Sequence, residues 1–288
     1  MAFKINHLPV ATTLQSRGRL LSLAKPVVMG ILNLTPDSFF AGSRQQSVDL
    51  VLRTAEKMLS EGAAILDLGA ASTRPGSVQP SVQEETDRLI PAVAALAKTF
   101  PEAWLSIDTF RASVAEAAIH AGAHMINDIS AGDLDAAMLP AIARLKVPYI
   151  AMHMQGKPAT MQQHPQYTDV VSEVFDYLKE KTLACHALGI YDVLTDPGFG
   201  FGKAQAHNFA LMNHFADFRT LGCPVVCGIS RKGMIWKTLD ITPDAALNGT
   251  TALHMAALQQ GASILRVHDV KEAVEAVRLY EAFGRLTG

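Results

Sequence analysis

Polar and ionisable residues recur inside or directly after the short apolar runs of this 288-residue chain. In chain order they are Asn33, Asp67, Asp108, Asn127, Asp128, His153, Asp196, Ser230, Arg266 and His268. Polar residues that end strands before loops would account for two or three of them. They do not account for carboxylates and amides within apolar runs, such as Ser-Ile-Asp at 106–108, because a buried charge needs a partner or a ligand. The spacing therefore predicts a binding site for a polar ligand.

A cationic group lies near the end of the chain. Arg266 and His268 are two residues apart in an apolar run, so both side chains point to the same side if the run is a strand. Arginine with histidine suits an anion such as a phosphate, and Lys232 adds another cation. The alternative for Arg266 is a structural ion pair. For His153 a structural role, in the core or in ordering a loop, is favoured over catalysis.

A glycine-rich segment, Asp-Pro-Gly-Phe-Gly-Phe-Gly-Lys, occupies 196–203. It is not a Walker A loop, because 197 is proline and 204 is alanine, and Lys203 stands where a dinucleotide motif needs its third glycine. We interpret it as a tight, flexible loop that lets the backbone approach a flat ligand, with Phe201 as an apolar wall and Asp196 beneath. Zinc-binding spacings are absent from the sequence, and amide and phosphate oxygens would instead suit Mg²⁺.

Eight short runs rich in valine, isoleucine and leucine would position these residues, and they predict parallel strands covered on both faces. The runs lie at 27–33, 65–69, 104–108, 125–129, 149–153, 193–196, 225–230 and 265–268. Helical patterns lie between and after them at 47–61, 81–99, 112–121, 169–188, 244–260 and 271–283. Ser81 and Glu84 have capping-box spacing at the start of one pattern, and a glycine follows each of the other five.

Strand–helix alternation repeated eight times predicts an α/β protein with a single (β/α)8 TIM barrel, and an open doubly wound sheet is the alternative. Residues 25–288 would form the barrel, and residues 1–24 an N-terminal extension or hairpin that closes its bottom. The polar run ends would then converge at the C-terminal ends of the strands, where the active sites of this fold lie.

Composition argues against several classes of function. Hydrophobic residues make up 49% and charged residues 18%, as in a globular enzyme. A net charge of -2 argues against nucleic acid as a partner. The sequence has no long apolar stretch and no N-terminal signal core, which argues against a membrane and favours the cytoplasm. The three cysteines, Cys185, Cys223 and Cys227, do not suggest a disulfide framework, and the last two are expected to be buried thiols.

Seven segments together resemble the dihydropteroate synthase family of pterin-binding barrel enzymes. They are MGILNLTPDSF at 29–39, STRPG at 72–76, IND at 126–128, MHMQG at 152–156, DPGFGFGK at 196–203, SRK at 230–232 and RVHD at 266–269. The segments occur in the order of the family and span nearly the whole predicted barrel. Each is weak alone, whereas the ordered set is highly specific.

The resemblance implies a transferase of folate biosynthesis. The family joins (7,8-dihydropterin-6-yl)methyl diphosphate to 4-aminobenzoate and releases diphosphate, and its members are sulfonamide targets and often homodimers. The resemblance further implies an SN1-like substitution assisted by Mg²⁺, with no protein nucleophile.

Site residues follow from the matching positions. The implied pterin-binding residues are Asp108, Asn127 and Asp196, with Lys232 on the carbonyl side of the ring. The implied diphosphate-binding residues are Arg266 and His268, with Asn33 acting through Mg²⁺. The residues implied near 4-aminobenzoate are Thr73, Arg74, Pro75, Phe201 and Ser230, and those on a closing loop are Asp37 and Phe39. Lys232, Arg266 and His268 form the implied catalytic set.

The sequence departs from the usual family pattern in three places. It has Phe-Ala-Gly-Ser at 40–43, Gly-Ala-Ala at 69–71 and Phe-Arg-Ala at 110–112, where Ser-Asp-Gly-Gly, Gly-Gly-Glu and Ser-Lys-Pro are usual. Two alternatives therefore stay open. A related methyltransferase would pass a methyl group from a pterin to a corrinoid and would lack the diphosphate clamp. A non-catalytic paralogue would bind pterin or regulate a partner, without releasing diphosphate.

Overall fold

The computed structural model describes residues 10–34, 44–71, 79–156, 161 and 165–285. Its eight-stranded sheet is parallel throughout and has the order β8-β7-β6-β5-β4-β3-β10-β9. A parallel bridge between Thr195 and Val225 joins the two ends of that order, so the sheet closes on itself. The strands are β3 Val27–Asn33, β4 Ile65–Gly69, β5 Trp104–Asp108, β6 Met125–Asp128, β7 Tyr149–Met152, β8 Val193–Asp196, β9 Val226–Cys227 and β10 Ile264–Val267. The predicted (β/α)8 barrel is confirmed.

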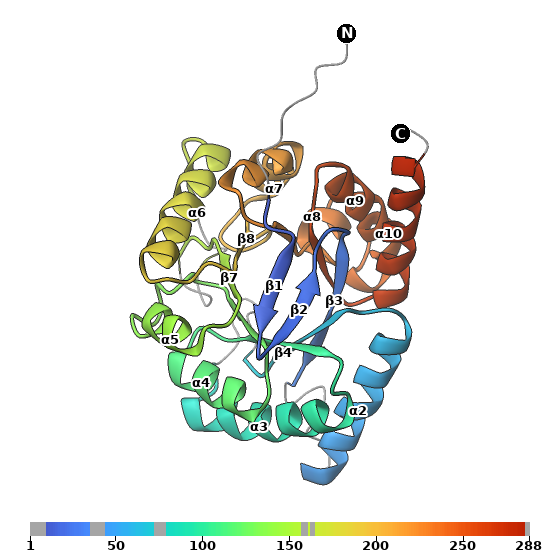
Figure 1. Cartoon of the computed structure of the whole chain (residues 1–288). Helices are drawn as coiled ribbons and strands as arrows, with labels where there is room; N and C mark the ends of the chain where they lie inside the picture. Colours follow the sequence, from blue (N-terminus) through green and yellow to red (C-terminus); the bar gives the residue numbers. More distant parts are fainter. Residues whose placement is uncertain (1–9, 35–43, 72–78, 157–160, 162–164, 286–288) are drawn as a thin grey trace.

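Helices surround the barrel (Figure 1). They are α2 Arg44–Ser60, α3 Val82–Thr99, α4 Ala112–Ala121, α5 Met138–Leu145, α6 Val170–Ala187, α7 Gln205–Asn213, α8 Gly233–Trp236, α9 Leu247–Gln259 and α10 Val270–Arg285, with short 3-10 helices η1 Phe215–Leu221 and η2 Pro243–Ala245. The predicted capping box opens α3, where the Ser81 hydroxyl accepts from the Glu84 amide and the Glu84 carboxylate from the Ser81 amide. Each such bond satisfies a backbone donor that the first helical turn leaves unpaired.

The barrel interior begins with an apolar layer to which every strand contributes one residue. The layer consists of Met29, Ile65, Trp104, Met125, Ile150, Leu194, Val226 and Ile264. Side chains on a strand alternate between its faces, so the neighbouring residues of each strand point outward to the helices. The next inward positions lie two residues further along each strand, toward its C-terminal end.

A hairpin lies against the N-terminal end of the barrel, in front of the strands in Figure 1. Its strands are β1 Thr13–Ser16 and β2 Arg19–Ser22. Leu14 is completely buried in the apolar layer, and the Gln15 amide donates to the Asp192 carboxylate at 2.8 Å. Arg19 donates to the carbonyl oxygens of Pro101 and Glu102. The hairpin therefore covers the bottom of the barrel, whereas the division of the chain at residue 24 stays a prediction.

Several predicted boundaries were wrong. The run at 225–230 contains only the two-residue strand β9, because the chain leaves the sheet at Gly228 and reaches a left-handed backbone conformation at Arg231. The strands predicted at 125–129 and 149–153 are each one residue shorter, and the strand predicted at 265–268 is shifted by one. Helix α10 passes through Gly284, and the pattern at 244–260 is divided between η2 and α9.

Two further expectations can be compared with the structure. All three cysteines are free and buried, as expected for Cys223 and Cys227. Within the described ranges, no helix has both the length and the apolar character needed to span a membrane.

Candidate active site

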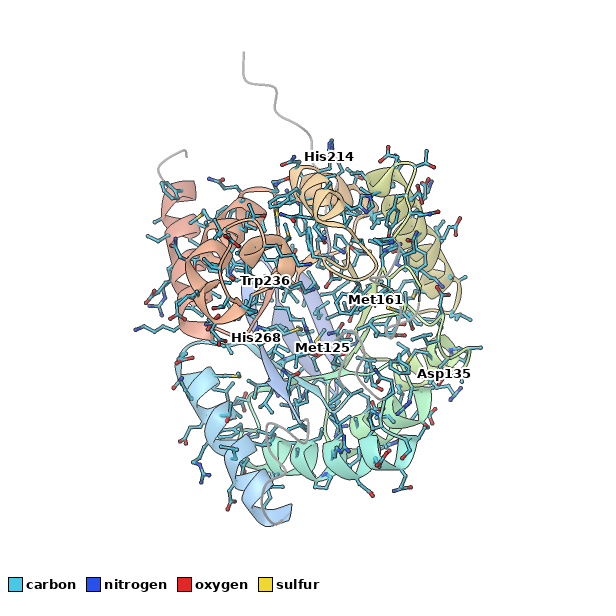
Figure 2. All side chains as sticks on the ribbon, turned by 180° about the vertical axis from the view of Figure 1, so that it is seen from behind. Met125, Asp135, Met161, His214, Trp236 and His268 are labelled. Atoms are coloured by element: carbon cyan, nitrogen blue, oxygen red, sulfur yellow. The ribbon has the colours of Figure 1, made fainter. Side chains whose placement is uncertain are left out.

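Five of the eight barrel strands have a polar or charged residue at the second inward position, beyond the apolar layer. These positions hold Ile31, Asp67, Ser106, Asn127, Met152, Asp196, Gly228 and Arg266. The strands thus bring together, toward their C-terminal ends, residues that are far apart in the sequence. Figure 2 views the molecule from the side opposite the hairpin, and His268 lies there on the inner side of the helix ring while Asp135 lies at its outer edge.

Arg266 is the centre of an ion-pair network between three strands. Its Nε lies 2.6 Å from Oδ2 of Asp67, and its Nη2 lies 2.6 Å from Oδ2 of Asp108. The Asn127 side-chain amide donates to the same Asp67 oxygen at 3.1 Å. Three of the residues implied in substrate binding are therefore connected, and two of the links run through a carboxylate that the family resemblance did not assign.

Burial and the charges of this network shift the pKa values of Asp108 and Arg266. Burial raises the pKa of Asp108 to about 7, although Arg266 opposes the shift; Asp67 adds to it. For Arg266, burial works against the charged form, but the Asp67 and Asp108 carboxylates outweigh it and raise the pKa further. The guanidinium is therefore permanently charged, while Asp108 titrates close to neutrality.

Lys232 lies beside Asp196 at the other side of the site. Its Nζ donates to the Phe199 carbonyl oxygen and lies 4.7 Å from the centre of the Phe201 ring. Burial lowers the pKa of Lys232 to about 8, although Asp196 favours the charged form. Asp196 accepts from the Gly198 amide at 2.7 Å, and burial raises its pKa. A flat, polar ring placed here would meet both a carboxylate and an ammonium group.

Ser230 and His268 are paired just after the C-terminal ends of the adjacent strands β9 and β10. The Ser230 hydroxyl oxygen accepts from the His268 amide at 3.2 Å and lies 3.1 Å from Nδ1 of the ring. Desolvation and the neighbouring Arg266 charge lower the pKa of His268 to about 4. The ring is thus neutral at physiological pH, so His268 can offer an anion one N–H bond but no charge.

Lys203 holds the glycine-rich loop in place. Its buried Nζ has three N–H donors, which are shared among the His153 ring and the carbonyl oxygens of Gly198 at 2.9 Å, Phe201 at 3.1 Å and His153 at 3.3 Å. It also lies 2.9 Å from Nδ1 of His153, and burial with the Lys203 charge lowers the pKa of that histidine to about 2. His153 therefore accepts the lysine's hydrogen bond in its neutral form, and the sequence prediction of Lys203 as a mere break in a glycine motif missed this role.

The glycines of this loop face the neighbouring loop. Gly198 has φ 69°, and a Cβ atom there would lie 1.9 Å from the His153 carbonyl oxygen. A Cβ atom at Gly202 would lie 2.3 Å from the Gln155 carbonyl oxygen. The close backbone approach in this structure is therefore to the segment after β7, which gives a physical reason for glycine besides contact with a ligand.

Asp128 points away from the barrel interior. Its carboxylate accepts from the Ser130 and Gly132 amides, both at 2.8 Å, and from the Tyr149 hydroxyl at 2.8 Å. These bonds satisfy a buried carboxylate without a ligand. Asp128 is thus a structural residue, although it follows Asn127 directly.

Asn33, the implied Mg²⁺ ligand, ends β3 opposite Gly69 of β4. The described ranges contain no group of three His, Cys, Asp or Glu residues that could hold a metal ion. An amide oxygen is nevertheless the kind of ligand that Mg²⁺ accepts, because this ion takes one or two protein oxygens together with phosphate and water. The donor set fits a magnesium ion that arrives with a diphosphate.

Five implied site residues lie outside the described residues. They are Asp37, Phe39, Thr73, Arg74 and Pro75. The structure brings the other implied residues to one end of the barrel and adds Asp67 and Lys203. The signal for Asp67 was present in the sequence, because a carboxylate at the middle of the run at 65–69 must face the barrel interior if its two leucine neighbours face the helices.

Comparison with known proteins gives this barrel its class. The pterin binding enzyme family matches residues 29–268. The chain is 45% identical to the dihydropteroate synthase of Escherichia coli (strain K12) over 269 residues, which cover 93% of this chain and 95% of the relative. It is 41% identical to the Haemophilus influenzae dihydropteroate synthase, with 93% and 98% covered.

Solved structures of dihydropteroate synthases are also similar to this chain. The Yersinia pestis dihydropteroate synthase in a sulfonamide drug complex has a TM-score of 0.89 and 44% identity, with 95% of this chain and 99% of that chain covered. The Xanthomonas albilineans dihydropteroate synthase with 4-aminobenzoic acid has a TM-score of 0.89 and 41% identity, with 96% and 99% covered.

The barrel is thus a pterin-binding enzyme: the chain belongs to that family. Within the family it belongs to the dihydropteroate synthases, which are transferases. The expectation from the sequence motifs is confirmed at both levels.

Proposed function

We propose that the polar end of the barrel joins (7,8-dihydropterin-6-yl)methyl diphosphate to 4-aminobenzoate by a division of labour between its two sides. The observation that carries this proposal is the convergence of Asp108, Asn127, Asp196 and Lys232 around one end of the barrel, with Arg266 adjoining them. The first four would bind the pterin, and Arg266 with His268 would bind the diphosphate.

The proposed pterin site is supported by the match between its hydrogen-bonding groups and those of a pterin. The aminopyrimidinone edge of a pterin offers adjacent N–H donors, which a carboxylate accepts in pairs. Asp196 and Asp108 supply carboxylates, and the Asn127 amide group gives its N–H to Asp67, which leaves its carbonyl oxygen as an acceptor. Lys232 would donate to the pterin carbonyl group.

The proposed diphosphate site is supported by the N–H donors of Arg266 and His268 that other described residues leave available. Among the described residues, Nη1 of Arg266 has no hydrogen-bond partner, and His268 offers one ring N–H. Asn33 would hold Mg²⁺, which would neutralise charge on the diphosphate. With the negative charge stabilised, diphosphate becomes a better leaving group.

The substitution would be SN1-like. The C–O bond between the pterin methylene carbon and the diphosphate breaks, and diphosphate leaves with the electron pair. The electron-rich dihydropterin ring stabilises the cation-like methylene carbon. The amine nitrogen of 4-aminobenzoate then forms the C–N bond with its lone pair and releases a proton to solvent. The protein contributes by holding both reactants close together and aligned.

The second substrate would bind near Phe201 and Ser230, with Thr73, Arg74 and Pro75 contributing and with Asp37 and Phe39 on a closing loop. The structure of the Xanthomonas albilineans relative with 4-aminobenzoic acid supports this substrate class. Sulfonamide inhibition, a homodimeric state and a cytoplasmic location are further proposals from family membership.

An assay of the purified chain with both substrates and Mg²⁺ tests the proposal. We expect stoichiometric release of diphosphate and formation of dihydropteroate, and loss of both with Lys232→Met. Pterin binding without diphosphate release would instead favour the non-catalytic paralogue. Methyl transfer from a methylated pterin to a corrinoid would favour the methyltransferase.

A further inference from the structure

Asp67 contacts both sides of the proposed site with a single oxygen atom. Its Oδ2 accepts from Nε of Arg266 at 2.6 Å and from Nδ2 of Asn127 at 3.1 Å. We infer that Asp67 is a positioning residue that sets the orientation of the pterin-binding amide and of the diphosphate-binding guanidinium together. This inference rests on the proposed function for the roles of Asn127 and Arg266.

Asp67 cannot contact solvent, and its position excludes direct contact with a substrate in this conformation. The residue is completely buried at the middle of β4. A buried carboxylate is unfavourable unless a charge and hydrogen bonds compensate it, and Arg266 supplies the charge. The carboxylate therefore acts through its two neighbours.

The contact fixes which atom Asn127 presents to a ligand. An amide group can turn so that either its N–H₂ group or its carbonyl oxygen faces a given partner. An ionised carboxylate only accepts hydrogen bonds, so Asn127 must offer its N–H₂ group to Asp67. Its carbonyl oxygen is then left for the N–H donors of a pterin. Without Asp67 both orientations would be populated, and one of them would present the wrong group.

The second contact fixes the plane of the Arg266 guanidinium. Asp67 holds Nε, while Asp108 of the adjacent strand holds Nη2 at 2.6 Å. Gly69 leaves room for this arrangement, because a Cβ atom there would lie 3.3 Å from Cβ of Asp108. Two carboxylates on one planar fork leave Nη1 as the donor without a partner among the described residues. The anion-binding direction of Arg266 is thus set by residues that the anion does not contact.

Asp67 also influences Asp108 through space. The charges that act on Asp108 are those of Arg266 of β10, Asp67 of β4, Glu85 of α3, Asp128 of β6 and Lys232. The negative charge of Asp67 is one of the causes that raise the pKa of Asp108 to about 7. Removal of that charge would lower the pKa of Asp108 and extend the pH range in which it is ionised.

The test is Asp67→Asn in the full chain, with two probes measured separately by calorimetry: 6-hydroxymethylpterin, which has no diphosphate, and inorganic diphosphate with Mg²⁺. We expect both affinities to fall by about tenfold or more, as for the loss of charge-assisted hydrogen bonds. We also expect the acid limb of the pterin-binding pH profile to move to lower pH, which a merely structural role would not produce.

Ser106→Ala is the matched control. Ser106 lies opposite Asp67 in the strand register, is equally buried, and makes no side-chain hydrogen bond among the described residues. Its removal should leave both affinities within about twofold, since no hydrogen bond is lost. If Asp67→Asn fails to fold, Asp67→Glu keeps the charge opposite Arg266 but moves the oxygen, so both affinities should still fall together.

The outcomes separate the inference from the proposed function. If the unaltered chain binds neither probe, the site assignment itself fails. If the unaltered chain binds both probes and a folded Asp67 variant loses affinity for only one of them, or for neither, the inference is overturned while the proposed function stands. A parallel loss of both affinities in Ser106→Ala would likewise overturn it.

Discussion

Arg231 and Asp269 form a two-point ion pair between the segments that follow β9 and β10. Nε and Nη2 of Arg231 each lie 2.8 Å from a carboxylate oxygen of Asp269. Arg231 stands between Ser230 and Lys232, and Asp269 follows His268. The pair therefore joins two segments that carry site residues through side chains that bind each other.

Replacement of this arginine should weaken both stability and activity. Arg231 also donates to the carbonyl oxygens of Pro243 and Asp244, so Arg231→Gln removes several charge-assisted hydrogen bonds at once. We expect the free energy of unfolding to fall by about 2 kcal/mol. We also expect kcat/KM to fall by roughly tenfold, because Lys232 and His268 lose their fixed spacing. Urea unfolding and steady-state kinetics measure the two effects.

Arg144→Gln is the control for that variant. Arg144 pairs with Glu116 on the surface, where the two side chains are 65% and 37% exposed. An exposed pair of this kind contributes little, so stability should change by no more than about 0.5 kcal/mol and kinetics should not change. Equal effects of the two substitutions would contradict a special role for the Arg231 pair.

Pterin affinity should depend on pH in a bell-shaped manner. Burial raises the pKa of Asp108 to about 7, so below that pH the carboxyl group carries a proton and cannot accept two N–H bonds. Burial lowers the pKa of Lys232 to about 8, so above that pH the ammonium group loses its charge. Binding should therefore strengthen as pH rises through about 7 and weaken above about 8. Calorimetric titration between pH 5.5 and 9.5 checks this.

The acid and alkaline limbs of this pH profile can be assigned to Asp108 and Lys232 by separate substitutions. Lys232→Arg keeps a permanent charge, so the alkaline limb should disappear while the acid limb remains. Asp108→Asn removes the acid group, so the weakened binding should no longer improve between pH 6 and 7. A profile of the unaltered chain that is flat from pH 6 to 9 would contradict both assignments.

The sequence predicted the barrel well because strand chemistry is local. Four predicted strands match the structure residue for residue, since each is a short, largely apolar run that ends in a polar residue or glycine. Helices α5 and α7 and the four-residue α8 were not predicted. Helix α5 is short and has Pro140 in its first turn, and α7 has apolar residues on all sides rather than along one face. Only α7 lacks a clear helical period; α5 has a buried face of Met138, Ala141 and Ile142, but it is only eight residues long.

The site was predicted only as a set of polar residues at one end of the barrel. The ion pair between Asp67 and Arg266 joins residues 199 positions apart. Sequence spacing alone does not show that two such distant residues are in contact. The same holds for Lys203 and His153, which meet because two adjacent loops pack through glycine. Family motifs supplied roles for Asp108 and Arg266, but the partners that orient them came only from the folded chain.

Lys203 should hold the glycine-rich loop at 196–203 in the conformation that binds substrate. Lys203→Met keeps the length of the side chain but leaves the carbonyl oxygens of Gly198, Phe201 and His153 without their donor. We expect the free energy of unfolding to fall by about 3 kcal/mol and KM for both substrates to rise, because Asp196 and Phe201 belong to this loop. Lys237→Met, at an exposed lysine, should change neither. A Lys203 variant with unaltered KM values would show that the loop holds its shape without this contact.

The hairpin at the barrel bottom should contribute stability but not catalysis. Leu14 is completely buried against the apolar layer that includes Met29 and Trp104, and the polar site lies beyond that layer. Leu14→Ala should therefore lower the free energy of unfolding by about 3 kcal/mol, the usual cost of a cavity in a packed core. Leu20→Ala, on the same hairpin, should have little effect because Leu20 is 69% exposed. Since the two ends of the barrel are separated by a packed layer, kcat and both KM values should remain unchanged in both variants at temperatures where the chain stays folded. A fall in kcat for folded Leu14→Ala would mean that a change of packing in the apolar layer alters the active site.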